Sequence, residues 1–206
     1  MCRGLQAVVA THGIIGIITA MNDPTIFDII AEAARKADVR LILIGGFAVN
    51  AYNYARNTKD IDFLTTDEDY RKLSEVLSLS GYEESLRTEV FAKRTRKGTK
   101  DLPVDFLFVD PSTFEIIWRG GQEAIFFGHK FRLPSLLHLM ALKLHAVKQG
   151  TKNRSWKDIP DILNLIEANG IDVHAPAFIE ICHKYGPEGI HSEILKMLAG
   201  GENGRS

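Results

Sequence analysis

The stretch LILIGGFAVNAYNYARNTKDIDFL, residues 41–64, decides which fold we expect for this chain. Its first part belongs to an apolar run, residues 39–44, which contains one charged residue, Arg40, and has the length and hydrophobicity of a strand that is covered on both faces. Gly45-Gly46 interrupts this run, as glycines do at strand-to-helix turns. We therefore expect a buried strand, a glycine turn and a short helix over about residues 46–54.

Two aspartates lie at the end of this stretch, in a second strand expected over residues 60–64. Alternation along a strand places Asp60 and Asp62 on one face, roughly 6 to 7 Å apart. Two carboxylates in this arrangement repel each other unless a cation lies between them. Mg²⁺ suits the position, because it takes oxygen ligands and is commonly held by one or two carboxylates plus substrate phosphates. A lone D-x-D is also common at solvated strand ends, so the pair needs further support.

Further support comes from Asp105, which lies in another apolar strand, expected over residues 102–109. An aspartate in a buried strand costs free energy unless it is paired or bound to a metal. The glycine turn adds a place for phosphate, since glycines let the backbone approach a ligand and a helix N-terminus offers free N–H donors. No G-K-[ST] follows these glycines and no G-x-G-x-x-G is present, which excludes a Walker loop and a dinucleotide fingerprint.

The remaining pattern divides the chain into an α/β part and a helical part. Capping residues mark the helix starts: Asp23 before Pro24, and the pair Thr66 and Asp69, whose helix ends at Gly81. In the α/β part we expect helices over 24–37, 66–79 and 112–119, an exposed strand over 89–97, and a hairpin over 123–132 that turns at Gly128. In the helical part we expect helices over 134–149, 156–168, 174–185 and 188–199. The resulting division is an N-terminal extension (1–22), an α/β domain (23–132) and a helical subdomain (133–206).

Strand, Gly-Gly, helix, D-x-D strand and a later lone-Asp strand, in this order, resemble the polymerase-β nucleotidyltransferase superfamily. Within it, the chain is most similar to the small bacterial AbiEii/AbiGii-type branch. The matching segments are Arg56-x-Thr58-x-Asp60-x-Asp62-Phe63, Val104-Asp105-Phe106, and residues 143–166, which look like a lysine helix followed by a K-D-x-x-D element. The loop from Gly46 to Asp60 is longer than in the minimal pattern, and residues after about 170 match nothing. The resemblance implies an α+β fold: a mixed sheet flanked by helices, with a C-terminal helical subdomain.

The resemblance also implies a chemistry. Asp60 and Asp62 would coordinate Mg²⁺ (or Mn²⁺) that bridges the triphosphate of an NTP. Asp105 would help to bind a second metal ion and activate the attacking hydroxyl of the acceptor. Gly45 and Gly46 would hold phosphate oxygens through their backbone amides.

Three more side chains are candidates for nucleotide binding, each with an ordinary alternative. Lys143 is at the edge of the apolar stripe of its helix, so it either snorkels to water or reaches phosphate. Asp158 either caps the first turn of the helix over 156–168 or contacts the cleft. Arg56 orients a carboxylate, contacts substrate or lies at the surface. The apolar stripe beside Lys143 consists of Leu133, Leu137, Met140, Leu144 and Val147.

Charge and cysteine content limit the partners. The net charge of −1 means that no overall field attracts nucleic acid or a membrane. One local exception is Lys93–Lys100, with five basic residues in eight, which is either a solvated loop or a surface for an RNA acceptor such as tRNA. Cys2 and Cys182 form no disulfide framework, so we expect a reducing cytoplasm. Residues 5–20 loosely resemble a signal peptide but are too short for a membrane span and are interrupted by His12 and two glycines.

The leading hypothesis is transfer of a nucleotide from an NTP to a hydroxyl of RNA, protein or a small molecule. In the AbiEii-like branch such proteins act as toxins or in phage defence, which implies a cognate antitoxin. Two alternatives stay open: a catalytically silent nucleotide-binding or interaction module of this fold, and an aminoglycoside-type adenylyltransferase. The intact set of three aspartates argues against the first, and the basic run favours a nucleic-acid acceptor over the second.

Overall fold

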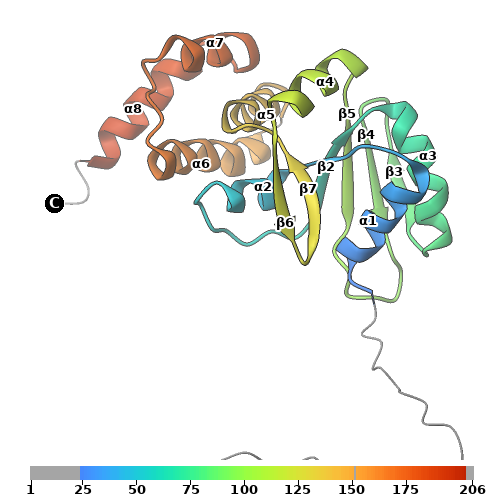
Figure 1. The fold of residues 1–206 in the computed structure, drawn as a ribbon. Coiled ribbons are helices and arrows are strands. Elements are labelled where there is room, and N and C mark those ends of the chain that lie inside the picture. The colour runs from blue at the N-terminus through green and yellow to red at the C-terminus, as the bar shows by residue number, and fades with distance from the viewer. Residues whose placement is uncertain (1–23, 151, 203–206) are drawn as a thin grey trace, which may run out of the picture.

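The structure is a computed structural model that describes residues 24–150 and 152–202, with residues 152–156, 201 and 202 described by their backbone alone. The expected N-terminal extension, the expected helix cap Asp23 and Cys2 therefore lie outside the described residues. The described residues form a seven-stranded mixed sheet flanked by eight helices (Figure 1). This confirms the α+β fold expected from the sequence.

Strands and helices are mixed along the chain up to Leu133, and the described elements after Leu133 are all helices. The helices are α1 (Ile26–Ala37), α2 (Gly45–Ala51), α3 (Asp67–Leu79), α4 (Pro111–Gly120), α5 (Leu136–Gln149), α6 (Lys152–Asn169), α7 (Pro176–Tyr185) and α8 (Ile190–Glu202). The strands are β1 (Ile42–Ile44), β2 (Ile61–Thr65), β3 (Glu83–Arg87), β4 (Phe91–Thr95), β5 (Val104–Phe108), β6 (Gln122–Phe126) and β7 (His129–Leu133). The division into two domains stays a prediction. None of the helices in the described part of the chain has the length and hydrophobicity needed to cross a membrane.

The sheet has the order β3-β4-β5-β2-β1-β7-β6. The pairs β2–β5 and β1–β7 are parallel, and all other neighbours are antiparallel. Strand β1 lies inside the sheet with all three residues buried, as its continuous hydrophobicity predicts. Because β2 and β5 run in the same direction side by side, their first residues lie at the same end of the sheet.

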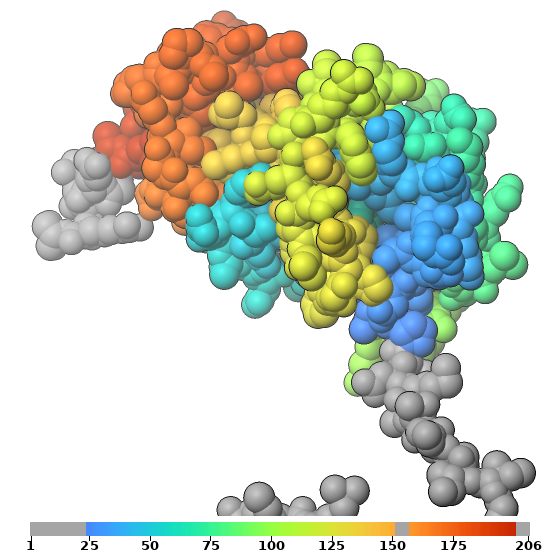
Figure 2. Space-filling model, viewed as in Figure 1, coloured from blue at the N-terminus to red at the C-terminus, as the bar shows by residue number. Residues whose placement is uncertain are grey.

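The two faces of the sheet are covered differently. On one face α1 and α3 pack side by side over Phe63 and Phe106, which belong to the main core (Figure 1). On the other face α4 packs over Ile42 and Leu64, in a smaller core. Since side chains alternate along a strand, Asp62 lies on the same face as Leu64, where it lines a cleft. Helices α5–α8 gather beside α2 at one end of the molecule, opposite the end that contains α1 and α3 (Figure 2).

Capping and turn residues behave largely as predicted. The Thr66 side chain accepts a hydrogen bond from the Asp69 amide and caps α3. The β6–β7 hairpin turns at Phe127 and Gly128, which both have positive φ, the geometry of a two-residue turn between twisted strands. The expected cap of α1 is wrong: Thr25 caps this helix, and a reciprocal hydrogen bond with Asp28 completes a capping box.

Four strand and helix assignments differ in detail from those predicted. Strand β3 was not predicted, because EESLR is exposed at every position on a sheet edge and carries no apolar alternation. The strand expected to be exposed over 89–97 is β4, which lies inside the sheet with alternating burial. Helix α2 ends at Ala51, not at residue 54, and β2 begins one residue after Asp60.

Candidate metal and nucleotide site

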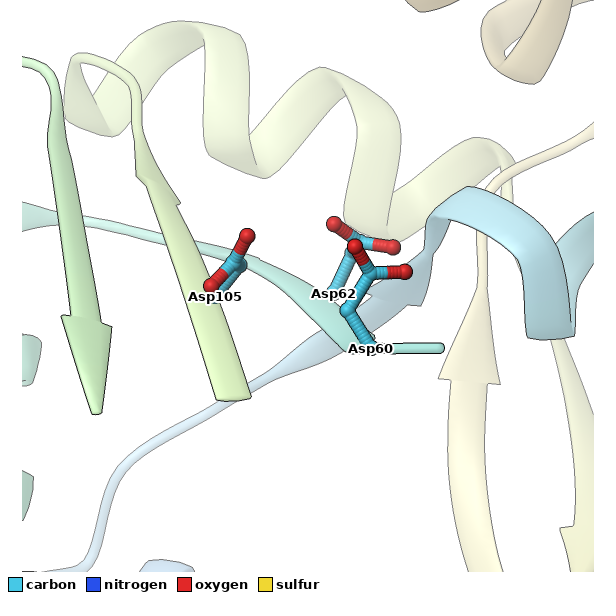
Figure 3. Close-up of side chains that lie close together, drawn as sticks. All are labelled: Asp60, Asp62 and Asp105. Atoms are coloured by element: carbon cyan, nitrogen blue, oxygen red, sulfur yellow. The ribbon is translucent and has the colours of Figure 1, made fainter. Parts of the chain in front are cut away.

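Three carboxylates converge where strands β2 and β5 begin (Figure 3). Asp62 on β2 is the register partner of Asp105 on β5, and Asp60 directly precedes β2. One oxygen atom from each side chain lies within 4.8 Å of the others. The sequence therefore identified three residues that the fold brings into one cluster, although Asp105 is distant in sequence.

The glycine turn is required by the position of Asp62. Gly45 has a φ of +61°, in the left-handed region, and a Cβ atom at this residue would overlap the Asp62 carboxylate. At Gly46 a Cβ atom would overlap the Thr58 hydroxyl. Gly45 thus lets the start of α2 approach Asp62, and Gly46 lets it approach Thr58.

Hydrogen bonds within the loop between α2 and β2 position Asp60. The Thr58 hydroxyl lies 3.0 Å from the Asp60 carbonyl oxygen and 3.2 Å from its Oδ1 atom. The Asn50 side chain donates to the Arg56 carbonyl at 3.0 Å and accepts from the Arg56 amide at 2.9 Å, which fixes the loop against α2. Arg56, Thr58 and Asp60 of the R-x-T-x-D pattern therefore each have a partner in this structure.

Burial and neighbouring negative charge both affect the pKa of Asp62. Burial, followed by the neighbouring charges of Asp60 and Asp105, raises the pKa of Asp62 from 3.8 to about 6, against opposing contributions from Lys143 and Arg56. A carboxylate that is hard to ionise in this way gains much from a bound cation. Asp105 differs from Asp62 because the Lys93 ammonium lies 3.0 Å from its Oδ1 atom and 3.1 Å from its Oδ2 atom.

The opposite wall of the site comes from α5 and α6. Lys143 is only 8% exposed, and its Nζ atom lies 2.7 Å from Asp158 Oδ1 and 2.6 Å from Asp161 Oδ2. The second oxygen of Asp161 lies 2.9 Å from Arg56 Nε, so Asp161 joins Lys143 to the loop before β2. The result is a buried network of two cations and two carboxylates.

This network decides between several of the alternatives raised by the sequence. Lys143 does not snorkel, since its ammonium is buried in ion pairs. Asp158 does not cap a helix, because α6 begins at Lys152 and Asp158 lies in its second turn. Arg56 does not lie free at the surface, because its guanidinium is partly buried and pairs with the Asp161 carboxylate. The prediction that Leu137 belongs to the apolar stripe is wrong: Leu137 is exposed, and Leu139 is buried in its place.

Asp161 is the main residue that the site prediction omitted. The K-D-x-x-D element contained the signal, since residues three apart share one face of a helix and Asp158 was already a candidate. What the sequence could not provide is the packing of α6 against α5, which turns both carboxylates towards Lys143.

An open cleft of about 740 Å³ lies between the two walls. Its lining includes all three clustered aspartates, Gly45 and the network around Lys143. Apolar surface comes from Tyr54, Phe91, Leu107 and Leu142. Lys59 and Lys157 also line the cleft, and no side chain in the described part of the chain forms an ion pair with either of them. The cleft therefore combines clustered carboxylates with two lysines that are available to a ligand.

The basic run beside the cleft does not form a continuous charged surface. Arg94 is 2% exposed and donates to the Tyr70 hydroxyl and the Tyr82 carbonyl. Arg96 lies 3.3 Å from Asp101, and Lys97 lies 2.6 Å from Glu83. Alternation along β4 explains the burial of Arg94, because it faces α3 while its neighbour Lys93 faces Asp105.

The fold is that of nucleotidyltransferases. It is similar to the antibiotic-resistance factor ANT(2'')-Ia, with a TM-score of 0.50 and 15% identity over 87% of this chain and 90% of that one. It is also similar to the lincosamide antibiotic adenylyltransferase LnuA, with a TM-score of 0.47 and 17% identity over 66% of this chain and 92% of that one. A third similar structure is the Megavirus polyadenylate synthase, with a TM-score of 0.48 and 16% identity over 74% of this chain and 34% of that one. No curated protein matches the chain in sequence.

The family of the chain follows from its sequence as a whole. The family model described as "uncharacterised nucleotidyltransferase" matches residues 25–199, nearly the whole described part of the chain. The protein belongs to this family and is an enzyme of the nucleotidyltransferase class. The match covers both walls of the cleft, from Gly45 to Asp161.

Proposed function

We propose that this protein transfers a nucleoside monophosphate from an NTP to a hydroxyl group of an acceptor, and that the transfer depends on Mg²⁺ (or Mn²⁺). The observation that carries this proposal is the convergence of Asp60, Asp62 and Asp105 beside Gly45 in an open cleft. The family match supports the class of reaction. The metal, the residue roles and the acceptor are our inferences from the geometry.

The carboxylate cluster fits a divalent cation of the Mg²⁺ type. Its donors are all oxygen atoms, and one oxygen from each residue lies close enough to the others to share an ion. The raised pKa of Asp62 fits as well, because a bound cation would favour the ionised carboxylate against burial and the neighbouring charges of Asp60 and Asp105. When bound, such an ion would neutralise charge on the attacking and leaving oxygens of an in-line displacement. Asp60, Asp62 and Asp105 would hold it.

The rest of the cleft fits a triphosphate. The amides of Gly45 and Gly46 lie at the start of α2, where they can donate to phosphate oxygens. Lys143 is held towards the cleft by Asp158 and Asp161, so its position is fixed before any nucleotide arrives. We assign it, with Arg56, to phosphate binding, and we assign Asp158 to orienting Lys143.

Asp105 faces the acceptor side in this proposal and accepts the proton of the attacking hydroxyl. It lies on β5, away from Gly45 and next to the apolar residues Phe91 and Leu107. RNA, protein and small molecules all supply such a hydroxyl. Because most of the basic run is internally paired, the RNA acceptor rests on the cleft lysines Lys59 and Lys157 more than on Lys93–Lys100.

The AbiEii/AbiGii-like resemblance supports one biological setting, that of a toxin or phage-defence component with a cognate antitoxin. The family match supports the nucleotidyltransferase class and does not specify this branch. Aminoglycoside-type adenylylation and a silent nucleotide-binding module are the competing functions, and the same experiment separates them.

The experiment is a label-transfer assay. Purified protein is incubated with Mg²⁺, each α-labelled NTP in turn, and either bulk tRNA or a panel of aminoglycosides. We expect label on one acceptor class, lost with Asp62→Ala and retained with Glu188→Ala, which removes an exposed carboxylate far along the chain. NTP binding without transfer to any acceptor would favour the silent module. Neither transfer nor NTP binding by calorimetry would overturn the proposed function.

A further inference from the structure

The Lys93 side chain occupies a position in the site that the proposed chemistry does not use. The register of the sheet aligns one residue from each of four neighbouring strands: Ile44 pairs with Asp62, Asp62 with Asp105, and Asp105 with Lys93. All four lie in one cross-strand row, so their side chains share a face. Lys93 is therefore placed on the carboxylate cluster by the backbone itself.

The contact between Lys93 and Asp105 involves both carboxylate oxygens. The Lys93 ammonium lies 3.0 Å from Oδ1 and 3.1 Å from Oδ2. The Asp105 side chain is only 12% exposed, which limits the directions from which a second cation can reach it. The Lys93 side chain is 32% exposed and sits on a flexible stem, so it can leave this position without unfolding the strand.

We propose that Lys93 is an internal competitor of the divalent cation at Asp105 and thereby sets the affinity of the carboxylate cluster for metal. This rests on the proposed function, because it takes the cluster to be a metal site. A positive charge on Asp105 neutralises one of the three carboxylates and repels a cation held by the others. Metal binding then requires the ammonium to move away from Asp105. Lys93 is a positioning residue in this proposal, since it acts through Asp105.

A purely structural role of the Lys93–Asp105 ion pair can be distinguished from competition with the metal ion. If Lys93 only held Asp105 in place, its loss would loosen a metal ligand and weaken metal binding. If Lys93 competes with the cation, its loss strengthens metal binding. The two roles therefore predict changes of opposite sign in the same measurement.

The test measures Mn²⁺ binding to the full-length protein in the absence of nucleotide. Electron paramagnetic resonance of the free ion monitors the binding. We expect Lys93→Gln to lower the Kd for Mn²⁺ at least about tenfold, as removal of a unit charge close to a divalent ion requires. Lys93→Arg keeps the charge and should bind like the wild type. Lys97→Gln is the matched control, because Lys97 is a basic residue of the same run that pairs with Glu83 away from the cluster.

Asp105→Asn provides the second arm of the test. In this background Lys93→Gln should change the Kd much less than in the wild type, because the competed carboxylate is gone. Unchanged or weaker Mn²⁺ binding by Lys93→Gln, or an equal gain in both backgrounds, would overturn the role of Lys93 and leave the proposed function standing. Binding seen with Lys93→Gln but not with the wild type would support it. Absence of Mn²⁺ binding in every variant would remove the metal site and overturn both.

Discussion

The two walls of the cleft contain similar numbers of charges but balance them differently. On the strand wall, Asp60 and Asp62 lie beside Asp105, and their mutual repulsion contributes to a raised pKa at Asp62. On the helical wall, Asp158 and Asp161 hold Lys143, with Arg56 as the second cation, at ion-pair distances below 3 Å. The strand wall thus carries three carboxylates with one paired cation, Lys93, whereas both carboxylates of the helical wall are paired with cations.

This difference indicates which wall changes more when a ligand binds. A buried, paired network is in its final arrangement before any ligand binds, so the helical wall is preorganised. A carboxylate cluster with too little positive charge is stabilised by an ion from solution, so the strand wall changes most on binding. The strand wall should therefore control metal dependence, and the helical wall should control stability and the position of the phosphates.

The largest effect should come from the geometry of the strand wall. Gly45→Ala forces a Cβ atom into the space of the Asp62 carboxylate, at a residue with positive φ. We expect a loss of label transfer of at least about a hundredfold, because a displacement of about 1 Å in a catalytic group has this effect. Gly128→Ala is the control: it also has positive φ, but nothing lies within 4 Å of the added atom. A Gly45→Ala variant as active as Gly128→Ala would contradict the close approach.

The next effect should come from the helical wall. Lys143→Met leaves two buried carboxylates with Arg56 as their remaining close cation, and breaking a buried pair costs about 4 kcal/mol. Urea denaturation should show this loss in the free energy of unfolding. Lys72→Met removes an exposed lysine that also contacts two carboxylates, and it should leave the urea midpoint nearly unchanged. Equal effects of the two substitutions would show that the network is not the stabilising feature.

The sequence predicted the strand wall better than the helical wall. Asp60 and Asp62 share a face by simple alternation, and Asp105 stands out because it interrupts an apolar strand, so local patterns sufficed. The parallel pairing that aligns Asp62 with Asp105 is a non-local choice that no local pattern encodes. The same holds for Asp161, which depends on how α6 packs against α5, and for Arg94, which looked like part of a surface run until β4 was placed inside the sheet. Edge strand β3 carried no signal at all.

A smaller effect should appear in the stability of the metal-free protein. The folded state retains the Asp62 proton up to about pH 6, whereas an unfolded chain releases it near pH 3.8. Stability from this group is therefore present below about pH 4 and is lost as the pH rises through 6. Asp62→Asn mimics the protonated form and avoids this loss, so in EDTA at pH 7.5 it should be more stable than the wild type by at most about 3 kcal/mol.

Chemical denaturation in EDTA between pH 4 and 8 checks this prediction. The stability difference between Asp62→Asn and the wild type should grow with pH and level off above 6. Added Mg²⁺ should reduce the difference by stabilising the wild type alone. A difference that is independent of pH would contradict the repulsion within the strand wall.

The most direct test of the metal-dependent account is a crystal structure of the protein with Mn²⁺ and a non-hydrolysable NTP analogue, using anomalous scattering to locate the ion. We expect an anomalous peak coordinated by Asp60 and Asp62, with the triphosphate between this ion and Lys143. The phosphate oxygens should face the amides of Gly45 and Gly46. The same anomalous peak should be absent from crystals of the Asp62→Asn variant. An analogue bound without an ion at these aspartates, or an ion bound elsewhere in the cleft, would contradict it.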